Sequence, residues 1–184
     1  GVPEKAEEVV NNLQLRLDAI QQKIKEAPSE NENPKSQIPN PKSVFVLEWL
    51  EPPFAPGHWV PEQVEIAGGK CLLGKAGEKS VTTTYEKIVE AKPEVMVLVP
   101  CGYYTEDILR QLPQTVFPQE FAEIPAVQNG EIWALDATSY FSRPAPRVVE
   151  GAEILAKIFH PEIFGSPDES EAVRVSRDWL KFRK

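Results

Sequence analysis

Residues 43–50 read Ser-Val-Phe-Val-Leu-Glu-Trp-Leu, and residues 95–99 read Val-Met-Val-Leu-Val. Both runs are short and almost continuously apolar, which is typical of strands buried on both faces of a parallel sheet. A third strand is expected over residues 131–135. Helical patterns separate and follow these strands, at residues 61–67, 83–91, 105–112, 144–159 and 169–183. This order predicts an α/β fold in three layers: an open, mostly parallel sheet with helices on both faces.

One long helix is predicted ahead of the sheet. Its apolar side chains recur every three or four residues, which keeps them on one face, at Val9, Leu13, Leu17, Ile20 and Ile24. The helix is expected to lie as a strut across the body of the protein, although a docked N-terminal helix or half of a coiled coil would show the same pattern. The next segment is almost without apolar residues. The chain therefore divides into a helix (residues 1–28), a linker (29–42) and an α/β lobe (43–184).

Composition excludes several classes of function. The chain has 184 residues, with 20 Lys and Arg against 28 Asp and Glu, which gives a net charge of −8. An acidic protein does not favour nucleic acid or an anionic membrane surface as a partner. The longest apolar stretch, residues 95–100, is far shorter than the roughly 20 residues of a membrane span. We therefore expect neither a nucleic-acid partner nor direct insertion into a membrane.

The cysteines and histidines give little support for catalysis. Cys71 and Cys101 are consistent either with one disulfide or with two free thiols, and for Cys101 we expect a buried thiol rather than a nucleophile. His160 follows a predicted helix and is expected to be structural. No Gly-rich phosphate loop, nucleophile elbow or His-x-x-x-His pair is present. The chain is therefore predicted not to be an enzyme and to carry no cofactor. A weaker alternative groups Glu48, Glu51 and His58 as a metal or acid–base site.

Aromatic residues gather in the loops that follow the predicted strands. In open α/β sheets these loops form the ligand site, because the carboxyl ends of parallel strands meet at one edge. Large, flat aromatic side chains there suit a ring-bearing ligand, and a few polar groups would orient it. The candidate ligand-binding residues are Trp49, Phe54, Trp59, Tyr103, Ser139, Tyr140, Phe141 and Arg143.

Three segments resemble a known family. Residues 44–62 (Val-Phe-Val-Leu-Glu-Trp-Leu-Glu-Pro-Pro-Phe-Ala-Pro-Gly-His-Trp-Val-Pro-Glu), followed by Ala-Gly-Gly at 67–69, resemble the start of the C-terminal lobe of vitamin B12-binding proteins of ABC importers. Residues 85–98 are similar to the family's helix-to-strand motif, and residues 139–149 to the segment before its last long helix. These proteins belong to the helical-backbone class of substrate-binding proteins, in which one long helix joins two lobes.

The resemblance implies a function and roles for particular residues. It implies binding of cobalamin or a related corrinoid between two lobes, in the periplasm or elsewhere outside the cytoplasm, and delivery to a membrane permease. Phe54 falls where an aromatic residue lines the cleft, Tyr140 and Phe141 fall at its mouth, and Glu86 falls where a surface glutamate pairs with permease arginines.

This chain also departs from the family pattern, and other functions remain open. Ser80 stands where the B12-binding relatives carry Trp, and the family's N-terminal lobe is missing, so we expect a fragment whose natural start lies elsewhere. The alternatives are a siderophore, haem or metal ligand within the same class, or a stand-alone protein-interaction module.

Overall fold

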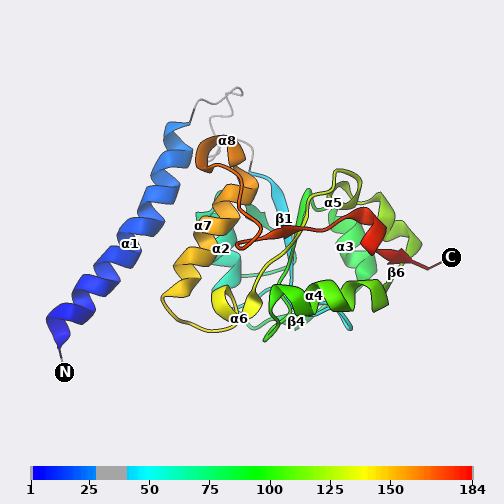
Figure 1. The fold of residues 1–184 in the computed structure, drawn as a ribbon, viewed down its shortest axis with the longest axis horizontal. Helices are drawn as coiled ribbons and strands as arrows, with labels where there is room; N and C mark the ends of the chain where they lie inside the picture. Colours follow the sequence, from blue (N-terminus) through cyan, green and yellow to red (C-terminus); the bar gives the residue numbers. More distant parts are fainter. Residues whose placement is uncertain (1, 28–40, 184) are drawn as a thin grey trace.

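The computed structural model describes residues 2–27 and 41–183 (Figure 1). Most of the predicted linker, residues 29–42, therefore lies outside the described residues. The central sheet follows the spatial order β3, β1, β5, β7, β8. Its first four strands are parallel, and β8 joins the edge antiparallel to β7. The strands are β1 (Ser43–Leu47), β3 (Lys70–Cys71), β5 (Val95–Leu98), β7 (Ile132–Ala134) and β8 (Val173–Arg174).

Strand β1 contributes to hydrophobic cores on both sides of the sheet. Val44 and Val46 pack into one core, whereas Phe45 and Leu47 pack into the other, and all four side chains are fully buried. This alternation follows from the two-residue period of a strand, whose successive side chains point to opposite faces. A continuously apolar run at the centre of a parallel sheet is therefore covered on both faces.

Helices cover the two faces of the sheet, as the sequence predicts (Figure 1). One face is covered by α1 (Pro3–Glu26), α2 (Val60–Ile66), α6 (Ala137–Tyr140), α7 (Arg147–Phe159) and α8 (Pro161–Phe164). The other is covered by α3 (Tyr85–Ala91), α4 (Thr105–Gln111), α5 (Pro125–Gln128) and two 3₁₀ turns, Leu112–Gln114 and Gln119–Glu123. The predicted three-layer α/β fold is confirmed.

Two short strand pairs lie beside the main sheet. Strands β2 (Phe54–Ala55) and β4 (Val81–Thr82) pair antiparallel, and β6 (Val116–Phe117) and β9 (Lys181–Phe182) pair in parallel. These two-residue strands were not predicted from the sequence, because they are too short to show a period.

Most predicted boundaries hold to within a few residues. The helix expected from residue 83 begins at Tyr85, because Thr84 is extended and its hydroxyl oxygen accepts a hydrogen bond from the Lys87 backbone N–H at 3.3 Å. Such a residue caps a helix rather than belonging to it. The helix expected over 144–159 begins at Arg147, after two prolines.

The helix predicted over residues 169–183 is wrong. This segment contains β8, a 3₁₀ turn at Arg177–Trp179, and β9. Its apolar residues serve different cores: Ala172 packs on one side of the sheet, whereas Val175 and Leu180 pack on the other. A segment that crosses a sheet edge and supplies both faces does not keep its apolar residues on one helical face.

Helix α1 docks on the body through its C-terminal half. Ile20 and Ile24 are buried, and the Arg16 guanidinium donates two hydrogen bonds to the Glu153 carboxylate on α7, at 2.6 and 2.8 Å. The N-terminal half projects away from the sheet (Figure 1), and Val9 remains 52 % exposed. The predicted apolar stripe therefore contacts the body along only part of its length.

Within the described ranges, no helix is both long and apolar enough to cross a membrane.

We expect Ile24→Ala to lower the free energy of unfolding by about 2–5 kcal/mol, because it removes a fully buried side chain and leaves a cavity. Leu15→Ala on the same helix is the matched control: Leu15 is 67 % exposed, so its truncation should change stability by less than about 0.5 kcal/mol. Urea unfolding followed by circular dichroism measures both values. Equal effects of the two variants would show that α1 is not docked through Ile24.

Candidate functional site

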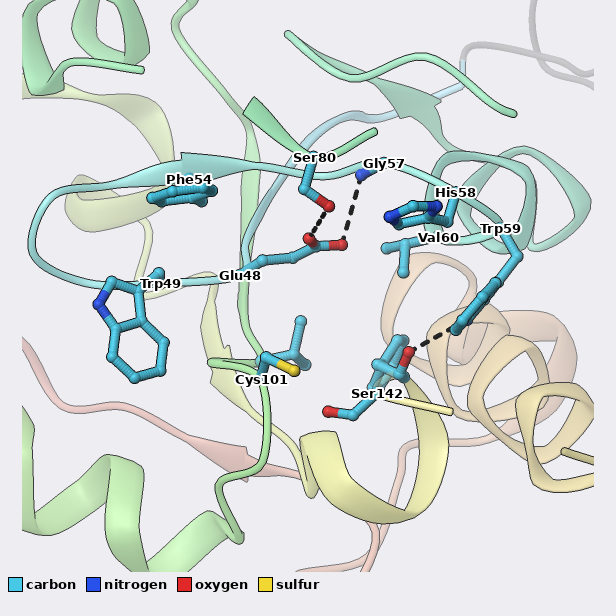
Figure 2. Close-up of a pocket in the computed structure, with 12 residues that line it drawn as sticks. Glu48, Trp49, Phe54, Gly57, His58, Trp59, Val60, Ser80, Cys101 and Ser142 are labelled. Atoms are coloured by element: carbon cyan, nitrogen blue, oxygen red, sulfur yellow. Dashed lines mark hydrogen bonds between the residues drawn. The ribbon is translucent and has the colours of Figure 1, made fainter. Parts of the chain in front are cut away.

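A pocket of about 460 Å³ opens beyond the carboxyl ends of β1 and β5 (Figure 2). Its lining is mostly apolar and aromatic, with a few hydroxyl and ionisable groups. The lining residues are Glu48, Trp49, Phe54, Gly57, His58, Trp59, Val60, Ser80, Val99, Cys101, Phe141 and Ser142. This is the edge at which parallel α/β sheets bind their ligands.

A tight turn after β1 builds one wall of the pocket. The Glu48 N–H donates to the Phe54 carbonyl and the Phe54 N–H donates to the Trp49 carbonyl, each at 3.1 Å. These bonds fold the chain back on itself, so that Trp49 and Phe54 both line the pocket (Figure 2). The Trp49 ring is held by an Nε1–H bond to the Glu51 carbonyl at 3.1 Å and by an edge contact with Tyr103, with the ring centroids 5.5 Å apart.

A close backbone contact builds the opposite wall. A Cβ at Gly57 would lie 2.2 Å from the Ser80 backbone nitrogen, so only glycine allows the two segments to approach this closely. The adjacent His58 has a φ of +55° and donates its N–H to the Glu78 carbonyl at 2.6 Å. These contacts fix the position from which His58 and Trp59 face the pocket.

Trp59 links this wall to the segment that follows β7 and α6. Its Nε1–H donates to the Phe141 carbonyl at 3.1 Å, which satisfies the polar end of a partly buried indole (Figure 2). The Trp59 and His58 rings lie 5.7 Å apart at an angle of 38°. The aromatic lining is therefore held by hydrogen bonds and ring contacts before any ligand arrives.

Glu48 is the acidic group of the pocket. Its carboxylate accepts hydrogen bonds from the Ser80 hydroxyl and, at 3.4 Å, from the Gly57 N–H (Figure 2). Burial raises the pKa of Glu48, and the two hydrogen bonds and the nearby His58 act in the opposite direction.

The structure separates the predicted ligand-binding residues into two groups. Trp49, Phe54, Trp59 and Phe141 line the pocket, although Phe141 is only 4 % exposed. Tyr103, Ser139, Tyr140 and Arg143 do not.

The residues outside the pocket have other contacts. Tyr103 makes the edge contact with Trp49 described above, and Tyr140 lines a second hollow between α1 and α7. The Ser139 hydroxyl donates to Asp136 at 2.6 Å and accepts from Arg147 at 3.3 Å. The segment after β7 forms the short helix α6, whose turn directs these neighbours to different surfaces.

Several residues that line the pocket were not among the predicted site residues. Four of them are adjacent in sequence to a candidate site residue or to a predicted strand end: Gly57, Val60, Val99 and Ser142. Ser80 was singled out only as a departure from the family pattern. It lies on the connection before β4, which returns to pair with β2, and no local pattern predicts that pairing.

The expectation of a buried Cys101 thiol is wrong. Cys101 is exposed and lines the pocket, because β5 ends at Leu98 and the chain turns outward after Pro100. Cys71 is half-buried, and both cysteines are free. Burial, followed by the charge of Glu65, raises the pKa of the Cys71 thiol to about 12.

The alternative metal site is not assembled. Glu48 and His58 both line the pocket, but Glu51 is exposed and lies outside the lining. Across residues 2–27 and 41–183, no group of three or more His, Cys, Asp or Glu side chains is placed to hold a metal ion.

Glu86 lies apart from the pocket, in the first turn of α3. Its side chain is exposed, and hydrogen bonding with Thr84 lowers the pKa of its carboxyl group. Glu86 is therefore a fixed negative charge on the surface.

Comparisons with known proteins agree with this fold. No protein-family model matches the chain. The chain is 26% identical over 100 residues to the vitamin B12-binding protein of Vibrio cholerae serotype O1, a match that spans 54% of this chain but only 33% of that protein. The sequence resemblance to the B12-binding protein is thereby confirmed.

Solved structures show the same architecture. A periplasmic binding protein from Veillonella parvula superimposes with a TM-score of 0.64 and 20% identity, over 87% of this chain and 52% of that one. The periplasmic heme-binding protein RhuT from Roseiflexus sp. RS-1 gives 0.64 and 20%, over 87% and 57%. An ABC transporter substrate-binding protein from Listeria monocytogenes gives 0.65 and 13%, over 85% and 57%. The chain thus has the fold of periplasmic binding proteins and spans about half of each of these structures.

We expect thiol-specific alkylation at pH 8 to label Cys101 and to leave Cys71 largely unmodified. With a pKa of about 12, only about one Cys71 thiol in ten thousand is ionised at this pH, and the thiolate is the reactive form. Peptide mass mapping measures the modification of each site. Cys101→Ser should abolish rapid labelling and Cys71→Ser should preserve it; rapid labelling of Cys71 would contradict its burial.

Proposed function

We propose that this chain is the C-terminal ligand-binding lobe of an ABC-importer substrate-binding protein whose ligand is cobalamin or a related corrinoid. The observation that carries the proposal is the aromatic pocket at the carboxyl ends of β1 and β5, in a chain with the periplasmic-binding-protein fold. The similarity to the vitamin B12-binding protein supports the choice of ligand. On this proposal the protein acts outside the cytoplasm.

The pocket suits the edge of a large ring system. Trp49, Phe54 and Trp59 present flat apolar surfaces, and burying such surface contributes roughly 25 cal/mol per Å². These rings are held in place by the contacts described above, so little side-chain entropy is lost on binding. A second lobe facing the pocket would complete the desolvation of the ligand, and this lobe alone should bind more weakly.

A binding role without chemistry accords with the lining. Glu48 and His58 are the ionisable side chains beside Cys101, and the proposal assigns them contact with the ligand rather than proton transfer. The relatives described above are binding proteins, and the one from Listeria monocytogenes is a substrate-binding protein of an ABC transporter.

We expect Trp59→Ala and Phe54→Ala each to weaken hydroxocobalamin binding by about tenfold to a hundredfold, because each removes a ring that would cover the ligand. Absorbance titration of the 184-residue chain measures the dissociation constants. Trp179→Ala is the matched control, since Trp179 is exposed and lies outside the pocket, and it should leave affinity unchanged. If wild type does not bind hydroxocobalamin, or the two pocket variants bind as wild type does, the proposed site is wrong.

The proposal also assigns Glu86 to contact with the membrane permease. An exposed carboxylate fixed in the first turn of α3 is accessible to an arginine, which can bind a carboxylate through two parallel hydrogen bonds.

We expect Glu86→Arg to reduce cobalamin uptake at least fivefold without changing affinity, because it reverses the charge at the proposed contact. Uptake of labelled cobalamin by cells whose own copy of the gene carries the substitution measures the effect. Glu106→Arg is the control: Glu106 is also exposed and also the second residue of a seven-residue helix, α4. Normal uptake by Glu86→Arg, or an equal loss in both variants, would remove the docking role.

A further inference from the structure

The ionisable side chains of the pocket include a carboxylate but neither lysine nor arginine among the described residues that line it. That carboxylate belongs to Glu48. His58 is the only basic side chain of that lining. The fixed charge that a ligand meets in this pocket is therefore negative, and Figure 2 shows the carboxylate between the two aromatic walls.

The Glu48 carboxylate keeps the capacity to accept more hydrogen bonds. Its Oε1 accepts from the Gly57 N–H at 3.4 Å and its Oε2 accepts from the Ser80 hydroxyl. A carboxylate oxygen accepts about two hydrogen bonds, so each oxygen retains an acceptor position. Both existing partners, Gly57 and Ser80, belong to the wall on which these two residues approach each other closely, and they hold the carboxylate among the residues that line the pocket.

A ligand therefore meets a half-buried acceptor that it must satisfy. Binding of a ligand displaces water from the Glu48 carboxylate. A neutral N–H donor on the ligand would replace the hydrogen bond that this water made. A ligand carboxylate in the same place would bring two like charges together in a partly desolvated site, which is strongly unfavourable. Recognition by charge thus adds to the nonspecific contact with the aromatic rings.

We infer that Glu48 is a specificity-determining residue that makes this pocket select ring ligands bearing neutral amides over ring ligands of the same size bearing carboxylates. This inference rests on the proposed function and narrows its substrate class. It favours corrinoids, whose edges carry amide N–H₂ groups, and it disfavours haem, whose edge carries two propionates. Ser80 contributes indirectly, by orienting the carboxylate.

A matched pair of ligands tests the inference. Dicyanocobinamide and dicyanocobyrinic acid share the corrin ring, but the first carries amides where the second carries carboxylates. Absorbance titrations of the 184-residue chain at pH 7.5 give the ratio of their dissociation constants. We expect wild type to bind the amide form at least tenfold more tightly, and Glu48→Gln, which keeps the shape and removes the charge, to reduce that ratio at least fivefold.

Glu51→Gln is the control variant. Glu51 lies three residues along the chain, is exposed and does not line the pocket, so its loss changes the net charge equally without changing the ratio. If neither corrinoid binds to wild type, the proposed function fails. If both bind and Glu48→Gln leaves the ratio unchanged, the inference about Glu48 is overturned while the proposed function stands.

A second measurement needs neither a ligand nor a folded Glu48 variant. The Cys101 N–H donates to the Glu48 carbonyl at 3.0 Å, and the exposed Cys101 lines the same pocket as Glu48. A cationic and an anionic methanethiosulfonate reagent each transfer a thioalkyl group to the thiolate and release methanesulfinate. The rate constant of each reagent with Cys101 is divided by its rate constant with glutathione. We expect this normalised rate constant to be at least threefold higher for the cationic reagent than for the anionic one.

The Glu51→Gln control separates this local effect from the net charge of the whole protein. The rate preference should persist in Glu51→Gln and fall in Glu48→Gln. A wild-type preference of one or below would overturn the inference even if Glu48→Gln failed to fold.

Discussion

The structure depends on the burial of β1 on both of its faces. This strand lies between β3 and β5, and it pairs with β5 over four residues from Val44 to Leu47. Because its side chains alternate between two cores, helices must cover both faces of the sheet, and the layers follow from that requirement. The chain becomes polar directly after Leu47, the last residue of this strand. Glu48 is the first polar residue there, and its position at the end of a buried strand is what places a carboxylate in the pocket.

The pocket forms where the chain leaves this buried layer. Backbone hydrogen bonds close the turn from Glu48 to Phe54, and the close contact of Gly57 with Ser80 holds the returning loop in place. Each wall is therefore fixed by backbone contacts rather than by the aromatic side chains themselves. Because the backbone fixes the walls, a pocket lined by large rings can stay open. The rings make hydrogen bonds and edge contacts with their neighbours instead of collapsing onto one another.

How far the site could be predicted depends on how local each contact is. Trp49 and Phe54 follow directly from a recognisable strand, so their place at the sheet edge was predictable. Tyr140 was equally aromatic and equally close to a strand end, but the turn of α6 directs it to the hollow beside α1. Cys101 was expected to be a buried thiol because the sequence shows no evident base to activate it as a nucleophile. Its exposure depends on the chain turning outward after Pro100, a path that is set by neighbouring loops.

The sequence by itself determined the layered α/β architecture, the long N-terminal helix and the edge of the sheet at which the pocket opens. These features follow from the period of apolar residues and from the order of strands and helices, which are local properties of the chain. Only the tertiary structure decided which loop residues share one pocket, that Ser80 orients Glu48, and that residues 169–183 cross the sheet edge. Such contacts join segments tens of residues apart, and packing rather than local periodicity selects them.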